Sequence, residues 1–165
     1  YMDHLQEYLP ANIPATDDCS IVHGDLQIAN MMMHASETEV IGILDWELST
    51  LGCPLADFAY LCRPYRDALR GIDLEPLGIP AEEAFVEAYC ERTGRSSIPN
   101  WDYYLAFNMF KMAAILQGIA RRVLDGTAAS NHAEEAGSGA FNMAKLAWAQ
   151  IDKSVDLSDL DELRG

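Results

Sequence analysis

The stretch that decides the fold is residues 20–47, which read SIVHGDLQIANMMMHASETEVIGILDWE. Three short apolar runs in it are typical of β-strands: residues 20–23, 30–34 and 40–44, the last rich in β-branched side chains. A polar segment, residues 35–39, separates the second run from the third. This pattern predicts a β-hairpin with a loop of about four residues.

The hairpin would bring polar side chains to one of its ends. A turn centred in the polar segment places Met31 opposite roughly Ile43, so Asn30 and Asp45 leave the hairpin side by side. Asp25 lies on the loop that enters the same end. We therefore expect these two carboxylates and the carboxamide to converge.

A second carboxylate, Glu47, follows two residues after Asp45. If the backbone stays extended, both carboxylates point to one side. Carboxylates and a carboxamide in this arrangement could orient a hydroxyl and bind magnesium around a phosphoryl group. His-x-Asp alone is more often an ordinary turn, but the joint order of strand, loop, Asn, hairpin and second Asp is far more specific.

The motif at residues 23–30, His-x-Asp-x-x-x-x-Asn, and the run Ile-Leu-Asp-Trp-Glu resemble the aminoglycoside phosphotransferase and choline kinase family. These are small-molecule kinases with the protein-kinase fold. Longer runs resemble the branch related to the kinase-like domain that some proteins fuse to an acyl-CoA dehydrogenase. These runs are residues 40–52, 54–60, 98–104 and 111–115.

The resemblance covers roughly residues 1–155 and implies a mainly α (α+β) fold. This is the helical C-terminal lobe of a protein-kinase-like fold, with a small β-hairpin carrying the catalytic and metal-binding loops. The acidic tail, residues 156–165, is expected to fray.

The resemblance also implies a role for each matched polar residue. Asp25 would be the catalytic aspartate, which accepts the proton of the substrate hydroxyl or orients that hydroxyl. Asn30 and Asp45 would hold Mg²⁺ and, through it, the phosphates of ATP. Glu47 would add a metal contact, directly or through water, because magnesium prefers hard oxygen ligands.

The resemblance also implies that two further residues support the loop that carries Asp25. His23 would be a packed, hydrogen-bonded residue, and Asp57 would accept backbone hydrogen bonds from the catalytic loop.

Ala29 and Cys53 depart from the family pattern, because relatives usually carry Asp at these two positions. Because they make the pocket less negative, they argue against a cationic acceptor such as an aminoglycoside or choline.

A basic pair follows the short helix after Asp57. Arg63 and Arg66, at i and i+3, could bind a phosphate or carboxylate of the substrate. Solvated surface arginines are the alternative interpretation of the same spacing.

The nucleotide-binding half of a kinase is not evident in this sequence. No Gly-x-Gly-x-x-Gly loop is present, and the first lysine is Lys111, far from any upstream strand. The nearest approach, residues 137–139 (Gly-Ser-Gly), lies in an alanine-rich helical pattern and indicates close helix packing instead. We therefore expect the C-terminal lobe of a longer kinase, inactive without the N-terminal lobe of the same protein.

Helical periodicity dominates the rest of the chain. The longest helix, residues 101–124, is expected at the centre of the core. Its apolar stripe is Leu105, Met109, Met112, Leu116, Ile119 and Val123, widened by Phe107, Phe110 and Ala114. The other expected helices are residues 1–9, 57–63, one from Pro80 to just before Gly94, and 131–154.

Composition favours a cytoplasmic domain. Half of the residues are hydrophobic, which suffices for a core, yet no run is long enough to span a bilayer and no signal peptide is evident. The four cysteines form no Cys-x-x-Cys pair and are expected to be reduced. The net charge of −15 argues against nucleic acid and anionic membranes as partners. The family resemblance implies a small-molecule hydroxyl substrate instead.

Two alternatives stay open. A kinase-like lobe could serve as a non-catalytic binding or scaffold domain, which Ala29 and Cys53 favour slightly. A metallophosphatase using His23, Asp25, Asn30 and His34 would need more histidine ligands than the four scattered histidines supply.

Overall fold

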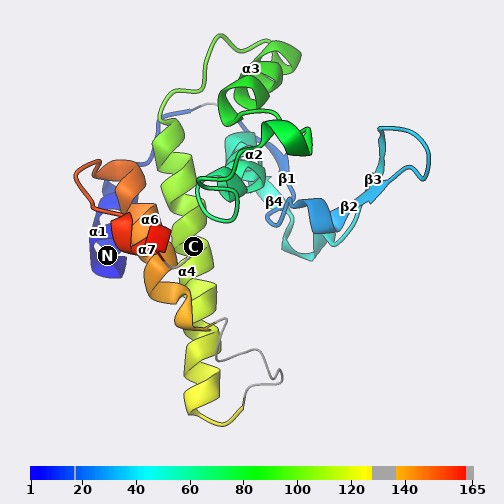
Figure 1. The fold of residues 1–165 in the computed structure, drawn as a ribbon. Coiled ribbons are helices and arrows are strands. Elements are labelled where there is room, and N and C mark those ends of the chain that lie inside the picture. The colour runs from blue at the N-terminus through cyan, green and yellow to red at the C-terminus, as the bar shows by residue number, and fades with distance from the viewer. Residues whose placement is uncertain (17, 128–136, 163–165) are drawn as a thin grey trace.

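A computed structural model describes residues 1–16, 18–127 and 137–162 of the chain. Its longest element is helix α4, Trp101–Leu124, with the bounds that the sequence predicted. The other α-helices are α1 (Met2–Ala11), α2 (Pro54–Cys62), α3 (Glu82–Thr93), α6 (Ala140–Ile151) and α7 (Ser158–Glu162). Helices α1, α6 and α7 lie on one side of α4, whereas α2, α3 and the strands lie on the other (Figure 1).

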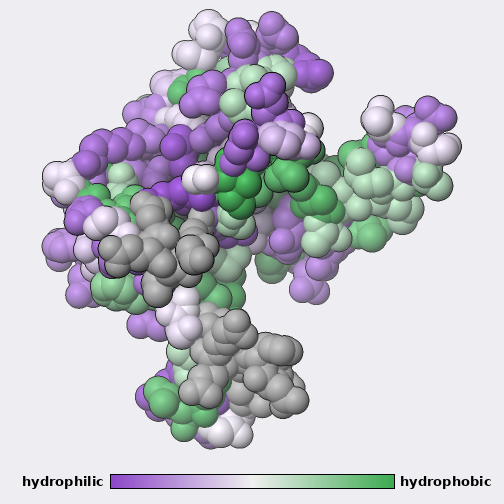
Figure 2. All heavy atoms as spheres, in the orientation of Figure 1, coloured by the Kyte–Doolittle hydropathy of each residue, from purple (hydrophilic) through white to green (hydrophobic). Residues whose placement is uncertain are grey.

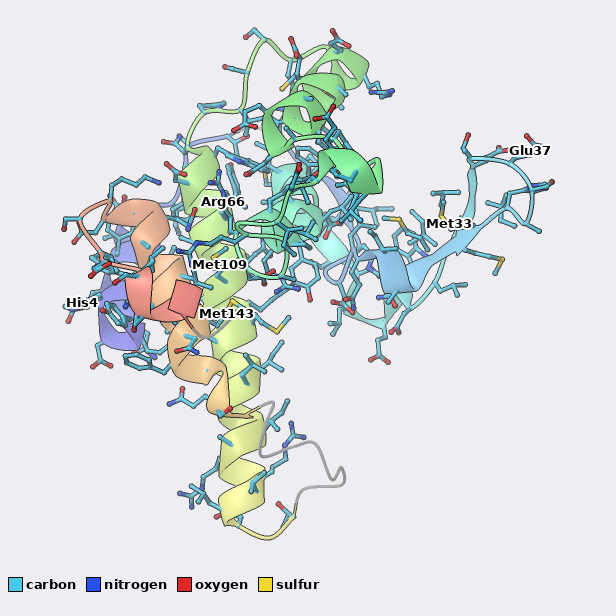
Figure 3. The ribbon with its side chains drawn as sticks, viewed as in Figure 1. His4, Met33, Glu37, Arg66, Met109 and Met143 are labelled. Atoms are coloured by element: carbon cyan, nitrogen blue, oxygen red, sulfur yellow. The ribbon has the colours of Figure 1, made fainter. Side chains whose placement is uncertain are left out.

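The first half of α4 is the centre of the core. Leu105 and Met109 are fully buried, and Met109 packs with residues of α1 and α6. In Figure 3, Met109 of α4 and Met143 of α6 lie close to this contact. The predicted stripe is therefore confirmed here, but the widening was wrong at Phe107, which is 38% exposed, and at Ala114.

The second half of α4 extends away from the body of the molecule (Figure 1). Gly137 packs against it so closely that an added Cβ would lie 2.8 Å from the Cα of Ala120. This contact confirms the interpretation of Gly137 as a close-packing residue. The last predicted helix, 131–154, corresponds to α6, and its portion 131–136 lies outside the described residues.

The prediction of a frayed tail was wrong for the residues that the structure describes. Helix α7 returns to the core, where the buried Leu160 joins the cluster formed by α1, α4 and α6. The ammonium group of Lys145 on α6 pairs with the carboxylate of Asp159 on α7. Apolar contacts of Leu157 and Leu160 and the ion pair of Asp159 thus dock an otherwise acidic segment.

Two antiparallel pairs of short strands flank the helices. Strand β2 (Met31–Met33) pairs with β3 (Val40–Ile43), and Met31 lies opposite Ile43 as predicted. This hairpin projects away from the helices (Figure 1). Strand β1 (Ser20–Val22) pairs with β4 (Thr50–Gly52), a pairing that the sequence did not predict. It brings residues 20–22 beside residues 50–52, so the segment between them folds back on itself.

A second cluster of side chains joins α2, α3 and α4. Phe58 of α2 stacks on Tyr89 of α3 with ring centroids 3.8 Å apart. Helix α2 begins at Pro54, three residues before the predicted start, because proline is well placed in the first turn of a helix. Helix α3 begins at Glu82 rather than Pro80, and α1 continues through Pro10 to Ala11.

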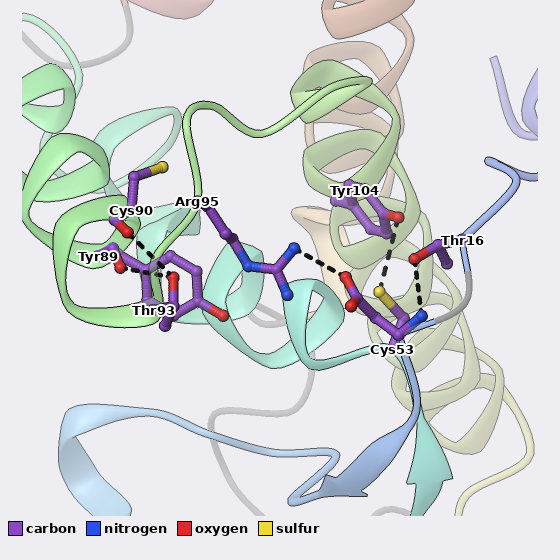
Figure 4. Close-up of polar contacts among 8 residues, drawn as sticks. Thr16, Cys53, Tyr89, Cys90, Thr93, Arg95 and Tyr104 are labelled. Atoms are coloured by element: carbon purple, nitrogen blue, oxygen red, sulfur yellow. Dashed lines mark hydrogen bonds and ion pairs between the residues drawn. The ribbon is translucent and has the colours of Figure 1, made fainter.

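Polar contacts tie the segment that enters β1 to the helices (Figure 4). Arg95, just after α3, forms an ion pair with Asp18 at 2.8 Å. The thiol of Cys53 donates to the hydroxyl oxygen of Tyr104 at 3.6 Å. The Cys53 side chain is therefore engaged with α4.

Hydrophobic side chains gather along the hairpin and at its base (Figure 2). Those that are exposed there are Ile28, Met32, Met33, Val40, Ile41, Ile43, Leu44, Trp46 and Leu48. Among the described residues, no helix has the length and apolar character needed to cross a membrane.

Candidate active site

A sharp turn after β1 carries the first candidate residues. Gly24 adopts φ +84°, a conformation that side chains with a Cβ rarely take. A Cβ at this position would also lie only 2.6 Å from the backbone oxygen of Leu48. Glycine is therefore required both by the turn and by the close approach of the segment after β3.

One carboxylate of α2 anchors this turn. The backbone N–H groups of His23 and Gly24 donate to the two oxygens of Asp57, the second at 2.9 Å. These are the hydrogen bonds predicted for Asp57. They fix the turn to the first part of α2, which the helix core in turn holds in place.

The imidazole ring of His23 links the turn to the end of β3. The ring is 2% exposed and packs against Trp46 with centroids 4.7 Å apart. Its Nδ1 accepts the backbone N–H of Asp25 at 3.2 Å, so the ring is neutral and Nε2–H donates to the carbonyl oxygen of Leu44 at 2.7 Å. His23 is packed and hydrogen-bonded, as predicted.

The metallophosphatase alternative loses its histidine ligands. Both ring nitrogens of His23 are already engaged within the chain. Nδ1 of His34 accepts the backbone N–H groups of Ser36 and Glu37 in the hairpin loop. Figure 3 shows Glu37 at the far end of the hairpin, so His34 belongs to the loop and not to the site.

Asp25 and Asn30 are brought together as predicted. The carboxamide nitrogen of Asn30 donates to the backbone oxygen of Asp25 at 2.9 Å and to Oδ2 of its carboxylate at 3.0 Å. Gln27 donates to the same Oδ2 at 3.0 Å, a contact that the sequence did not predict. Because the nitrogen of Asn30 makes both bonds, its carboxamide oxygen Oδ1 is oriented away from Asp25.

Asp45 is positioned by a hydrogen bond of the residue before it, Leu44. The backbone N–H of Leu44 donates to the backbone oxygen of Asn30 at 2.8 Å, which sets Asp45 beside the loop of Asp25. Asp45 itself adopts the left-handed conformation, with φ 67°. This backbone conformation is rare outside glycine and is enriched at functional sites.

The predicted extended backbone from Asp45 to Glu47 was wrong. The left-handed residue is followed by a 3₁₀ turn, Trp46–Leu48, so the two carboxylates do not alternate as in a strand. The turn arises because Trp46 folds back: its indole N–H donates to the Ile43 carbonyl at 2.8 Å. Asp45 and Glu47 are both exposed.

Two residues that the sequence analysis did not assign to the site also reach this loop. The ammonium group of Lys111 on α4 donates to the backbone oxygen of Gly24 at 2.6 Å and lies 4.2 Å from the ring centroid of Tyr60. Burial, then a hydrogen bond with Asp25 and its negative charge, raises the pKa of Tyr60 to about 12. Their signal in the sequence was weak, since both lie in helices distant along the chain.

The predicted substrate contacts of Arg63 and Arg66 are occupied within the chain. Arg63 forms an ion pair with Asp67 one turn later. Arg66 pairs at 2.9 Å with the carboxylate of Glu82, which is only 8% exposed. Because a buried carboxylate needs a charged partner, the Arg66–Glu82 pair links the segment after α2 to α3, whereas the Arg63–Asp67 pair stays within that segment.

The oxygen donors near Asp45 are too few to surround a metal ion completely, but they suit magnesium. Among the described residues, no three His, Cys, Asp or Glu side chains come together as a metal site would require. Magnesium usually binds through one or two carboxylates together with water and substrate phosphates. Asp45 and the outward Oδ1 of Asn30 fit that pattern.

A cavity of about 520 Å³ lies between α2 and α3, next to the loop that carries Asp25. Leu26 and Asp57 border it, and Phe58, Phe85 and Tyr89 supply most of its apolar wall. Its volume lies within the range of small-molecule binding sites.

Comparison with known proteins identifies the family. The sequence matches the phosphotransferase enzyme family (APH) over residues 1–107, which is more than half of the chain. The chain belongs to this family. The resemblance to small-molecule phosphotransferases is thereby confirmed.

The relatives also bear out the predicted branch. The chain is 43% identical over 155 residues to mouse acyl-CoA dehydrogenase family member 10 and 40% identical over 137 residues to human member 11. These alignments cover 89% and 78% of the chain, but only 14% and 18% of the relatives.

A solved structure shows the same fold. This is the crystal structure of a "putative aminoglycoside phosphotransferase" from Ralstonia eutropha, which is 46% identical with a TM-score of 0.86. The match covers 92% of this chain and 49% of that one, so the chain spans about half of the solved relative. The helical lobe with its small hairpin, an α+β kinase-like fold, is therefore confirmed.

Replacement of Gly24 tests the geometry of the turn. Gly24→Ala should destabilise the protein by about 2–4 kcal/mol, because it combines a positive φ with a clash against the Leu48 carbonyl. Gly71→Ala is the matched control: its φ is also positive, at +76°, but nothing lies within 4 Å of the added Cβ. It should cost about 1 kcal/mol. Urea unfolding of both variants measures the difference, and equal losses would contradict the clash.

Proposed function

We propose that the chain carries the catalytic and metal-binding half of a small-molecule kinase, which transfers the γ-phosphoryl group of ATP to a hydroxyl of its substrate. The observation that carries the proposal is the hydrogen-bonded network of three segments. Asn30 bonds both the backbone and the carboxylate of Asp25, and the residue before Asp45 bonds the backbone of Asn30. This order of residues, in a member of the phosphotransferase family, supports phosphoryl transfer.

Asp25 would act on the acceptor hydroxyl. Its carboxylate is partly exposed and is held by two donors on Oδ2, so its plane is fixed while the site stays accessible to a substrate. A carboxylate in this position orients the hydroxyl and takes its proton as the bond to phosphorus forms. The proton leaves the acceptor oxygen for Asp25, and ADP departs with the electrons of the broken P–O bond.

Asn30 and Asp45 would hold magnesium, and Glu47 would assist through water. When bound, the ion would neutralise charge on the ATP phosphates. Two features of the chain suit this role: the carboxamide oxygen of Asn30 is oriented away from Asp25, and Asp45 lies just after the end of β3.

A second lobe of the same protein would supply the phosphate cradle. The exposed hydrophobic surface of the hairpin and the following 3₁₀ turn, which includes Met33, Val40 and Trp46, supports a body packed against it. The chain also spans only about half of its solved relative. The missing glycine-rich loop and strand lysine would belong to that lobe.

A small molecule is the acceptor that the cavity favours. A concave, apolar space of about 520 Å³ next to Leu26 can enclose most of a metabolite-sized ligand. Because Arg63 and Arg66 are already paired with carboxylates of the chain, the hydrophobic wall of the cavity is the main feature of this side of the site.

Removal of the Asp25 carboxylate tests its assignment. In the full natural protein, Asp25→Ala should lower the rate of ADP release from MgATP by about 10²–10⁴-fold while the melting temperature changes little. Glu37→Ala, which removes an exposed carboxylate at the tip of the hairpin, is the control and should leave the rate unchanged. Undiminished turnover in Asp25→Ala would remove Asp25 from the mechanism.

The 165-residue chain alone should be inactive. Phosphoryl transfer needs a positioned nucleotide as well as a base and a metal, and the cradle is not evident in this sequence. The measurement is ADP release by the purified chain beside the full natural protein. Turnover by the chain within tenfold of the full protein would show that no second lobe is needed.

A non-catalytic binding or scaffold domain is the second candidate, favoured by Ala29 and Cys53 at positions where relatives usually carry Asp. The structure weakens the argument from Cys53, whose thiol is hydrogen-bonded to Tyr104 on α4. A full natural protein that binds its partners but releases no ADP would support this candidate.

A further inference from the structure

We propose that Lys111 is a positioning residue of the site: its ammonium group holds the carbonyl of Gly24 and so fixes the peptide that leads into Asp25. The inference rests on the proposed function for its meaning in catalysis, but its structural part can be measured separately. Lys111 lies on α4, whereas the other anchor of the turn, Asp57, lies on α2. The turn is thus held from two helices.

Several backbone N–H and carbonyl groups of residues 23–25 have hydrogen-bond partners outside the turn or in its side chains. Asp57 accepts the N–H groups of His23 and Gly24, and the His23 ring accepts the N–H of Asp25. Asn30 donates to the carbonyl of Asp25. The carbonyl of Gly24 lies between these groups, and the ammonium group of Lys111 donates to it at 2.6 Å.

The surroundings of Lys111 explain why a charged donor is suited to this role. The side chain is half-buried, and burial lowers the pKa of its ammonium group, whereas the negative charges of Asp25 and Asp57 raise it. The carboxylate of Asp25, on the turn, and that of Asp57, on α2, repel each other, and a cation that interacts with both offsets that repulsion.

Tyr60 completes the arrangement. Its ring is 4% exposed and lies under the ammonium group of Lys111, with 4.2 Å from Nζ to the ring centroid. A cation above an aromatic face is attracted by the ring electrons, most strongly where water is excluded. The ring therefore holds the lysine in the rotamer that reaches Gly24, and Tyr60 in turn belongs to α2, the helix of Asp57.

The test compares Lys111→Met with Lys111→Arg in the full natural protein. Methionine keeps the length and the apolar stem but removes the charge and the donor, whereas arginine restores both. Lys153→Met is the matched control, because Lys153 pairs with Asp102 at 3.1 Å on the exposed surface and touches no residue of the site. Lys111→Leu, which likewise removes the charge and the donor, is the second variant, to be used with the same expected outcomes if Lys111→Met does not fold.

The first readout is hydrogen exchange of the backbone amides of residues 23–25, followed by mass spectrometry. Exchange should be at least tenfold faster in Lys111→Met than in the wild type, and close to the wild-type rate in Lys111→Arg and Lys153→Met. Unchanged exchange in Lys111→Met would overturn the proposal.

The second readout is ADP release from MgATP. Lys111→Met should lower kcat about 10- to 100-fold with the KM for ATP unchanged, because a displaced Asp25 affects the reacting geometry and not nucleotide binding. Lys111→Arg should recover most of the rate. Faster exchange with an unchanged kcat in an active protein would also overturn the proposal.

The two readouts separate this proposal from the proposed function. A wild-type protein that releases no ADP would contradict the kinase assignment. The exchange rates would then decide alone whether Lys111 positions the loop: a faster rate in Lys111→Met supports it and an unchanged rate refutes it.

Discussion

The carboxylate of Asp57 accepts two consecutive backbone N–H groups, those of His23 and Gly24, and the rest of the site depends on this contact. Backbone groups in a tight turn have no partners within regular structure, so a buried turn needs acceptors from elsewhere. Asp57 provides them from a helix that the core already fixes. The turn can then adopt the positive φ at Gly24 and still hold Asp25 in one position.

From this anchor the network extends to the end of the hairpin where we propose that magnesium binds. The neutral ring of His23 joins the turn to Leu44, and the backbone of Asn30 joins the same residue from the other side. Asp25 and Asn30 are consequently parts of one hydrogen-bonded unit, and Asp45 directly follows the residue that joins it. Asp25 and Asn30 are partly exposed and Asp45 is exposed, which agrees with the proposal that another lobe completes the site.

Sequence patterns predicted the parts of this site that depend on local chemistry. The register of Met31 with Ile43 follows from alternation and a short polar loop, and helix α4 follows from its periodicity. The left-handed conformation of Asp45 could not be predicted, because the 3₁₀ turn that follows it includes Trp46, whose ring packs against His23, 23 residues earlier in the chain. The contact of Lys111 was missed for the same reason: no local pattern pairs residues 87 positions apart.

Calorimetric titration of MgATP into the full natural protein tests the central claim most directly, namely that the converged loops hold a magnesium nucleotide. The account predicts saturable binding that is lost when magnesium is chelated and weakened at least tenfold in Asp45→Asn, because one of the two protein oxygen ligands proposed for the ion then loses its charge. Absence of binding in the wild type, or binding that neither chelation nor Asp45→Asn diminishes, would contradict it.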